Sequence, residues 1–339
     1  MWFDPELVQT VGELAPPWLV LALAFLSFLG SAVLIVPLAG WLYLRGDRRV
    51  TAPLLAAVAL IYAAMTTSKA LVASQRPAVD PPVAVAELPL VLQPAYEHAA
   101  LIETGSFPSG HALAVLGFWA LLAVDTDVGT RARRYAAVAG VVAVVAASRV
   151  VLGAHYLGDV VGGFVLGAIV LGVVLAVRSR ATDPTAVLFG LAAVVATVGV
   201  LAGLVSSSAA TDPAVVAGGS LGALLGWRVT DGATSRPAAD RLPTPVPRVA
   251  TVFARLHRRV DGRSGERSSL RLVAAWGIGG LLALGAIGVV GATSVNASLP
   301  TAAGTTLLAH PLTLSLATGL VAAAVVATPA MVATGSDRR

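Results

Sequence analysis

The sequence contains no cysteine, only one lysine and few charged residues of either sign. The absence of cysteine excludes disulfide bonds, thiolate nucleophiles and cysteine-ligated metal sites. There are 23 basic and 18 acidic residues, 41 among 339 positions, and every basic residue except Lys69 is an arginine. Because charge is so sparse, a charged side chain inside or beside a long apolar run is a candidate for function.

Hydrophobic residues make up 57% of the chain, and the mean hydropathy is +0.83. Runs of about 18 or more apolar residues are typical of transmembrane helices, so the sequence predicts an integral membrane protein. Residues 1–16 are acidic, and we therefore expect no secretory signal peptide there. Asp4 and Pro5 fit the N-cap and first position of a short amphipathic helix at the membrane interface. Its apolar stripe would consist of Leu7, Val11 and Leu14.

The apolar runs predict an all-α fold, a polytopic membrane helix bundle with nine spans. Residues 17–206 would form a six-span catalytic core, and residues 207–339 a C-terminal extension with about three more spans. A basic loop at 230–269, rich in Pro and Arg, interrupts the extension. The expected spans are 18–44 (kinked at Pro37), 52–73, 109–128, 135–153, 156–177, 185–206, 213–229 (short and Gly-rich), 270–293 and 312–334.

The distribution of basic residues predicts the topology through the positive-inside rule. With an outward amino terminus, 20 of the 23 basic residues fall on the cytoplasmic side. The three exceptions are Lys69, Arg76 and Arg149. The basic loop is then cytoplasmic, next to anionic headgroups. It lacks the interleaved aromatic residues of a nucleic-acid site, so no nucleic-acid partner is expected.

The segment Ser148–Asp159 brings a histidine and a carboxylate together. His155 and Asp159 are four residues apart, which on a helix places them on one face about one turn from each other. The carboxylate can then accept the Nδ1 proton of the imidazole and leave Nε2 free for chemistry. Gly153 lets the chain turn between Arg149 and His155. A structural pair at a helix end is the alternative, and two further segments weigh against it.

Those two segments reach the same predicted face. Lys69 and Arg76 lie at the outer end of the second span, and Pro108-Ser109-Gly110-His111 opens the third. Cations that converge with the free N–H groups of a helix start suit a multiply charged oxyanion. With two histidines nearby, the set indicates phosphoryl transfer, one histidine acting as nucleophile and the other as proton donor. No His, Asp and Glu cluster with metal-ligand spacing is present.

Together the three stretches resemble the three-part motif of the type 2 phosphatidic acid phosphatase (PAP2) superfamily. That motif reads Lys, six residues, Arg-Pro; then Pro-Ser-Gly-His; then Ser-Arg, five residues, His, three residues, Asp. Eleven positions match it in the right order. They are Lys69, Arg76, Pro77, Pro108, Ser109, Gly110, His111, Ser148, Arg149, His155 and Asp159.

The resemblance implies a role for each matched residue. His155 would attack phosphorus and form a phosphohistidine, and Asp159 would orient it. His111 would protonate the leaving oxygen and then activate water. No metal or cofactor is implied, since cations would neutralise the phosphate as Mg²⁺ does elsewhere. The phosphate oxygens would be held by Lys69, Arg76, Ser109, Gly110 and Arg149.

The resemblance implies a metal-independent membrane phosphatase in the cell membrane, and the distribution of basic residues predicts that its site lies on the extracytoplasmic face. The substrate would be a lipid phosphate or diphosphate, such as a prenyl diphosphate, a phosphatidate or a phosphatidylglycerophosphate-like lipid. A phosphotransferase, or a phosphatase for soluble esters, would use the same motif. A non-catalytic anion-binding membrane protein is the third class, but it needs no proton donor. Beyond the lipid substrate and membrane lipids the sequence indicates no partner, and it does not set the oligomeric state.

Other polar residues are expected to be ordinary surface groups. His98 is predicted to be a solvated loop histidine, and His257 and His310 to be surface residues. Four apolar residues of the outer loop would rest on the membrane, gate lipid entry or simply pack over the site. They are Leu88, Leu90, Val91 and Leu92.

Overall fold

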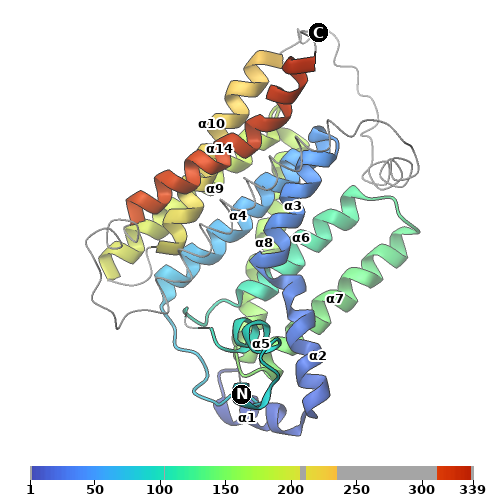
Figure 1. The fold of residues 1–339 in the computed structure, drawn as a ribbon, viewed down its shortest axis with the longest axis vertical. Helices are drawn as coiled ribbons and strands as arrows, with labels where there is room; N and C mark the ends of the chain where they lie inside the picture. Colours follow the sequence, from blue (N-terminus) through green and yellow to red (C-terminus); the bar gives the residue numbers. More distant parts are fainter. Residues whose placement is uncertain (1, 103, 207–210, 235–310, 337–339) are drawn as a thin grey trace.

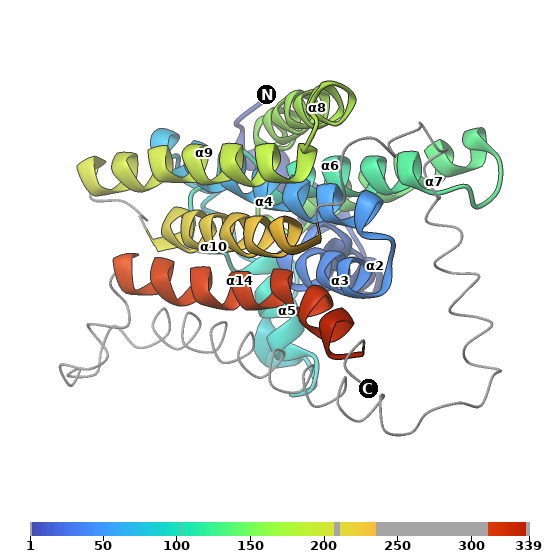
Figure 2. The ribbon, with the colours of Figure 1, turned by 90° about the horizontal axis from the view of Figure 1, so that it is seen from above.

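The structure is a computed structural model that describes residues 2–102, 104–206, 211–234 and 311–336. Over these residues the chain forms helices and no strand, as expected for a polytopic helical bundle. The long helices lie roughly side by side, and the N-terminal segment covers one end of the bundle (Figures 1 and 2).

The N-terminal segment begins with the predicted helix α1 (Pro5–Leu14). The Asp4 carboxylate accepts a hydrogen bond from the Glu6 N–H, and Pro5 is the first helical residue, so the predicted cap is confirmed. Leu7 and Leu14 of the apolar stripe are exposed. α1 meets the following helical stretch, which runs from Pro17 to Gly30, at an angle of 114°.

The first span predicted at 18–44 is interrupted, but not at Pro37 as expected. The segment forms α2 (Pro17–Ser27), a single 3₁₀ turn and α3 (Ala32–Arg45), with Pro37 inside α3. Ser31 caps α3 by accepting a hydrogen bond from the Val33 N–H. At Gly30 the chain approaches the His111 backbone so closely that a Cβ atom would lie 2.9 Å from its carbonyl oxygen. The break therefore lies at a glycine, whose lack of a side chain allows the backbone at His111 to pack closely against it.

The central bundle follows the expected order of spans. Its central helix, α4, packs against α3, α6, α9 and α10. Because the apolar runs set these elements, their ends lie within a few residues of the predictions, the seventh span being longer than expected. The helices are α4 (Arg48–Val72), α6 (Gly110–Asp125), α7 (Arg131–Val151), α8 (Leu157–Arg180), α9 (Pro184–Ser206), α10 (Thr211–Thr234) and α14 (Pro311–Ser336).

Four of the described helices are long and apolar enough to cross a membrane, and the bent α1–α2 pair would add a fifth. α6 has 16 residues, about 24 Å of helix, which is short of a 30 Å hydrocarbon core. The predicted basic loop starts too early, because α10 continues through Thr234. The rest of that loop and the predicted span 270–293 lie outside the described residues.

The helices of the C-terminal extension pack on each other and on the core. Gly218, Gly222 and Gly226 of α10 bring its backbone against α14 at Ser315, Gly319 and Ala323. Small residues at a spacing of four are how membrane helices approach closely. At the end of the bundle remote from the amino terminus, the Tyr43 hydroxyl donates to the Val326 carbonyl (2.7 Å), and the Trp227 Nε1–H donates to Asp183 (3.2 Å). Both described helices of the extension, α10 and α14, thus form hydrogen bonds with the core.

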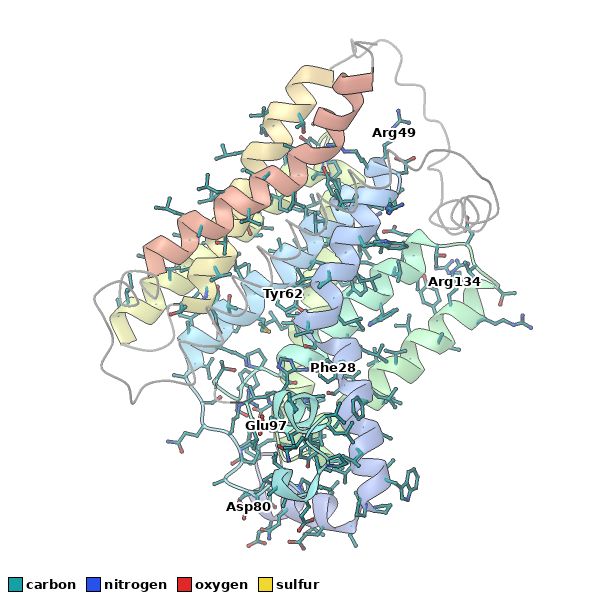
Figure 3. All side chains as sticks on the ribbon, in the orientation of Figure 1. Phe28, Arg49, Tyr62, Asp80, Glu97 and Arg134 are labelled. Carbon is teal, nitrogen blue, oxygen red and sulfur yellow. The ribbon has the colours of Figure 1, made fainter. Side chains whose placement is uncertain are left out.

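The two ends of the bundle differ in charge. Asp80 and Glu97 lie at the end that holds α1, whereas Arg49 and Arg134 lie away from it (Figure 3). Helix α5 (Gln93–Ala100) belongs to the loop that covers the α1 end. At the opposite end Arg178 and Asp125 form a bidentate ion pair with distances of 2.6 and 3.1 Å.

Candidate active site

Three segments far apart in the sequence converge at the α1 end. They are the end of α4 with the following loop, the loop that leads into α6, and the α7–α8 connection. Ser74 ties the first two together, since its carbonyl accepts from Ser106 N–H (3.0 Å) and its hydroxyl from Phe107 N–H (2.6 Å). Ser109 N–H donates to the Asp159 carbonyl at 2.9 Å and ties in the third. The convergence expected from the motif spacing is therefore present in the fold.

The α7–α8 connection places His155. Helix α7 ends at Val151, and Gly153 has a φ of +71°, which allows the turn that the sequence predicts. The backbone N–H groups of Ala154 and His155 both donate to the Arg149 carbonyl at 3.1 Å. The turn thus holds the backbone of His155 against the last turn of α7.

His155 and Asp159 do not share a helix face as predicted, because α8 begins only at Leu157. Instead the Asp159 carboxylate reaches back to the helix start, where Oδ2 accepts a hydrogen bond from the Tyr156 N–H (2.9 Å). The same oxygen lies 3.4 Å from His155 Nδ1, and both side chains are about 1% exposed. The pair is therefore assembled by helix capping.

Ser106 completes this pair and was not singled out from the sequence. Its hydroxyl donates to Asp159 Oδ2 and lies 3.5 Å from His155 Nδ1. Ser106 is fully buried. It orients the carboxylate that orients the imidazole, and this placement fixes the proton of His155 on Nδ1.

Arg76 faces the other side of the imidazole. Its Nη1 lies 3.2 Å from His155 Nε2, and it also donates to the Ala154 carbonyl. Burial lowers the pKa of Arg76 to about 10, which leaves it charged at neutral pH. Burial, reinforced by the positive charges of Arg76, Arg149 and Lys69, lowers the pKa of His155 well below its usual value. His155 is therefore a neutral imidazole with the Nε2 lone pair turned toward a cation.

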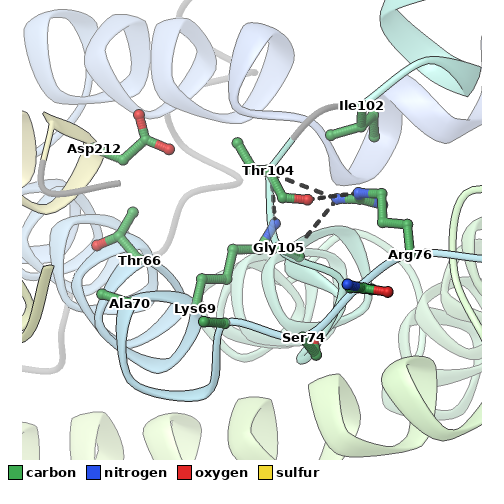
Figure 4. Close-up of a pocket in the computed structure, with 11 residues that line it drawn as sticks. Thr66, Lys69, Ala70, Ser74, Arg76, Ile102, Thr104, Gly105 and Asp212 are labelled. Atoms are coloured by element: carbon green, nitrogen blue, oxygen red, sulfur yellow. Dashed lines mark hydrogen bonds between the residues drawn. The ribbon is translucent and has the colours of Figure 1, made fainter. Parts of the chain in front are cut away.

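Thr104 links the two cations of the first motif and was also not singled out. Its hydroxyl accepts from Lys69 Nζ at 3.0 Å and from Arg76 Nη2 at 3.4 Å, and its carbonyl accepts from Arg76 Nε at 2.6 Å (Figure 4). Ser106 and Thr104 are both short polar residues in a loop, and only the folded arrangement distinguishes them from their neighbours.

Arg149 is fully buried and only partly paired. Its Nη2 donates to the Ala99 carbonyl at the end of α5, at 2.7 Å. Nε and Nη1 have no hydrogen-bond partner within the described parts of the chain. A buried guanidinium with two unused donor atoms is suited to bind an oxyanion.

The second motif forms the start of α6. Ser109 is its N-cap, and its hydroxyl accepts from the Ala112 N–H at 3.5 Å. Gly110 packs against Met65, where a Cβ atom would overlap the sulfur. His111 lies in the first turn, within electrostatic reach of Arg149 and Lys69, and its side chain has no hydrogen bond to another described residue. His111 is thus in the vicinity of the cations but is not bonded to His155.

His98 is solvent-exposed, as predicted, but it lies in a helix and not in an irregular loop. It belongs to α5, its ring stacks on Phe28 with centroids 5.3 Å apart, and its Nε2 lies 3.2 Å from Ser31 Oγ. Of the apolar outer-loop residues, Leu88 is buried in a cluster with Tyr96, and Leu90 and Val91 are more than 80% exposed. His257 and His310 lie outside the described residues.

The fold and the site define a class, namely a helical membrane protein with cations and a His–Asp pair buried at the ends of its helices. Within the described residues no group of three or more His, Asp or Glu side chains is placed to hold a metal ion. Residues 51–183 match the family model of the PAP2 superfamily, which is consistent with a member of that superfamily. This match supports a phosphatase-type function. No curated protein and no solved structure matches the chain.

Proposed function

We propose that this protein is an integral membrane phosphatase that hydrolyses a lipid phosphate or diphosphate through a phosphohistidine on His155. One observation carries the proposal: Nδ1 of His155 faces the Asp159 carboxylate, and Nε2 faces the Arg76 guanidinium. A phosphorus atom bonded to Nε2 would have its oxygens beside Arg76. The arrangement suits nucleophilic attack on a bound phosphate.

The reaction then has two steps. His155 Nε2 forms a bond to phosphorus while the bond to the leaving oxygen breaks, and that oxygen takes a proton from His111. Asp159 stabilises the positive charge that develops on the imidazole. In the second step water attacks the phosphohistidine after giving a proton to His111, and the P–N bond breaks to restore His155.

The buried cations bind and neutralise the phosphate in both steps. Lys69 and Arg76 already converge on Thr104, and two donor atoms of Arg149 have no partner among the described residues. Fixed donors in a site sheltered from water stabilise the charge of the transition state. This role requires no metal ion.

We expect activity that survives excess EDTA and is inhibited by vanadate, which mimics five-coordinate phosphorus. The measurement is release of inorganic phosphate by purified protein from a panel of prenyl diphosphates, phosphatidate, phosphatidylglycerophosphate and soluble phosphate esters. Strict dependence on added Mg²⁺ or Zn²⁺ would contradict the mechanism. Adding an acceptor alcohol and analysing the products separates hydrolysis from phosphotransfer.

The proposed site faces away from the cytoplasm. Lys69 and Arg149 lie in the last turns of α4 and α7, and Asp159 lies in the first turn of α8. The opposite ends of the same helices begin or finish with arginines, at Arg48, Arg131 and Arg180. Arginine-rich ends are typical of the cytoplasmic side, and lipid headgroups are available at the other.

Single cysteines in this cysteine-free chain test the orientation. Glu87→Cys in the loop over the site is expected to react with an impermeant maleimide on intact cells. Ser179→Cys at the far end of α8 is expected to react only after the cells are opened. Both wild-type residues are exposed, so accessibility within the fold is matched. Reversed labelling would place the site inside the cell.

A further inference from the structure

A cavity of about 510 Å³ opens beside the phosphate-binding cations. Most of its wall comes from the end of α4 and the two motif loops. One lining residue, Asp212, comes from the first turn of α10, beyond the segment that matches the family (Figure 4). The C-terminal extension therefore contributes a carboxylate to a cavity that is otherwise built by the core.

The end of the cavity near Arg76 offers hydrogen-bond donors. Lys69 and Arg76 are cations, and the Thr104 hydroxyl accepts a bond from each of them. A hydroxyl has two lone pairs, so with both in use Thr104 has only its proton left to offer. This end suits the phosphate oxygens of a substrate.

The other end offers acceptors. Thr66 and Asp212 lie on the side of the cavity away from Arg76 (Figure 4). The Thr66 hydroxyl donates its only proton to the Tyr62 carbonyl, at 2.9 Å, and keeps a lone pair that can accept a hydrogen bond. The Asp212 carboxylate has no hydrogen bond or ion pair with the other described residues, although it lies within electrostatic reach of Lys69. A carboxylate and a hydroxyl without a free proton suit a group that donates hydrogen bonds.

We propose that Thr66 and Asp212 form a subsite for a hydroxyl or ammonium group located a few bonds from the substrate phosphate. This inference rests on the proposed phosphatase function and narrows its substrate to lipid phosphomonoesters that carry such a donor. A second phosphate at this end would face the Asp212 carboxylate, so diphosphates are disfavoured. Asp212 thus selects the substrate, and it takes no part in the attack on phosphorus.

A simpler role for Asp212 would be to balance the charge of Lys69. The two roles make different predictions, because charge balance affects every phosphate substrate alike. A subsite affects only substrates that have the donor. The test therefore compares two lipids that differ in one hydroxyl group.

The probes are 1-acyl-glycerol 3-phosphate, which has a free 2-hydroxyl, and its 2-deoxy counterpart. For the wild-type full chain we expect kcat/KM to favour the hydroxyl lipid by about 10–100-fold, the value of a hydrogen bond to a charged group. Asp212→Ala is expected to remove the preference and Asp212→Asn to reduce it. Thr66→Val is expected to weaken the preference and Thr66→Ser to retain it. Asp80→Ala removes an exposed carboxylate of the outer loop and is the matched control.

A wild-type protein without the preference would overturn the subsite, as would an Asp212→Ala variant that loses the same factor on both lipids. A second readout needs no turnover. It measures how much each of the two lipids raises the melting temperature of the His155→Ala protein. There the hydroxyl lipid should stabilise more strongly, and adding Asp212→Ala should remove the difference. If the binding preference is present and no phosphate is released by the wild type, the phosphatase proposal fails and the subsite stands.

Discussion

His155→Ala is expected to abolish phosphate release, with a loss of roughly 10⁴–10⁶-fold in kcat, the range seen when a nucleophile is removed from a catalytic triad. The reason is geometric. Nε2 of His155 is the proposed nucleophile, and it lies 3.2 Å from Arg76 Nη1. No other described histidine is held by a carboxylate. Release of inorganic phosphate from a lipid phosphate under single-turnover conditions measures the loss.

The variant should remain folded, because the bond that anchors this turn uses the backbone N–H of His155 and survives in alanine. His98→Ala is a matched control, since it removes a histidine from the same end of the molecule and leaves the His–Asp pair intact. Rapid quenching of the wild type should trap an acid-labile, base-stable phosphoprotein, which the His155 variant should lack. Wild-type turnover in His155→Ala would rule out the mechanism.

Apolar run length was sufficient to predict most of the fold. It locates α4, α7, α8 and α9 because a hydrocarbon core requires about 20 apolar residues whatever their order. It failed at 18–44, where the composition is uniformly apolar and the break depends on Ser31 capping a new helix and on Gly30 meeting the His111 backbone. The approach of Gly30 to His111 cannot be predicted without knowing the position of the neighbouring helix.

The residues of the candidate site were likewise predictable only in part. The residues with unusual chemistry for a membrane segment, such as Lys69, Arg149 and His155, stand out in a chain with little charge. Ser106, Thr104 and Asp212 do not, because serine, threonine and aspartate are common in loops and at helix starts. Their importance arises from distances between segments, and one sequence carries no record of those distances.

The helical spacing of His155 and Asp159 gave the correct pair through the wrong geometry. The four-residue interval was read as one helix face, but His155 precedes α8 and Asp159 turns back to cap it. Capping binds the carboxylate to the backbone at Tyr156 as well as to the imidazole. The aspartate is therefore also fixed by a backbone contact that a shared helix face would not supply.

Asp159→Asn is expected to fold normally and to lose about 10⁴-fold in kcat, as removal of the orienting carboxylate does in a comparable triad. The amide oxygen can still accept from the Tyr156 N–H, so the start of α8 is retained. The same oxygen position faces His155 Nδ1, so the amide oxygen keeps that contact and the substitution changes mainly the charge beside the imidazole. Loss of the negative charge also removes the stabilisation of the phosphorylated imidazole.

Ser106→Ala is the graded comparison for this variant. It removes the hydroxyl that donates to Asp159 Oδ2 but keeps the carboxylate, so a loss of only about tenfold in kcat is expected. Both variants should keep the KM of the wild type, because neither residue is assigned to the phosphate. An Asp159→Asn enzyme within tenfold of the wild type, with the two variants equal, would show that the carboxylate only caps α8. A loss in the expected order would show that Asp159 acts through His155.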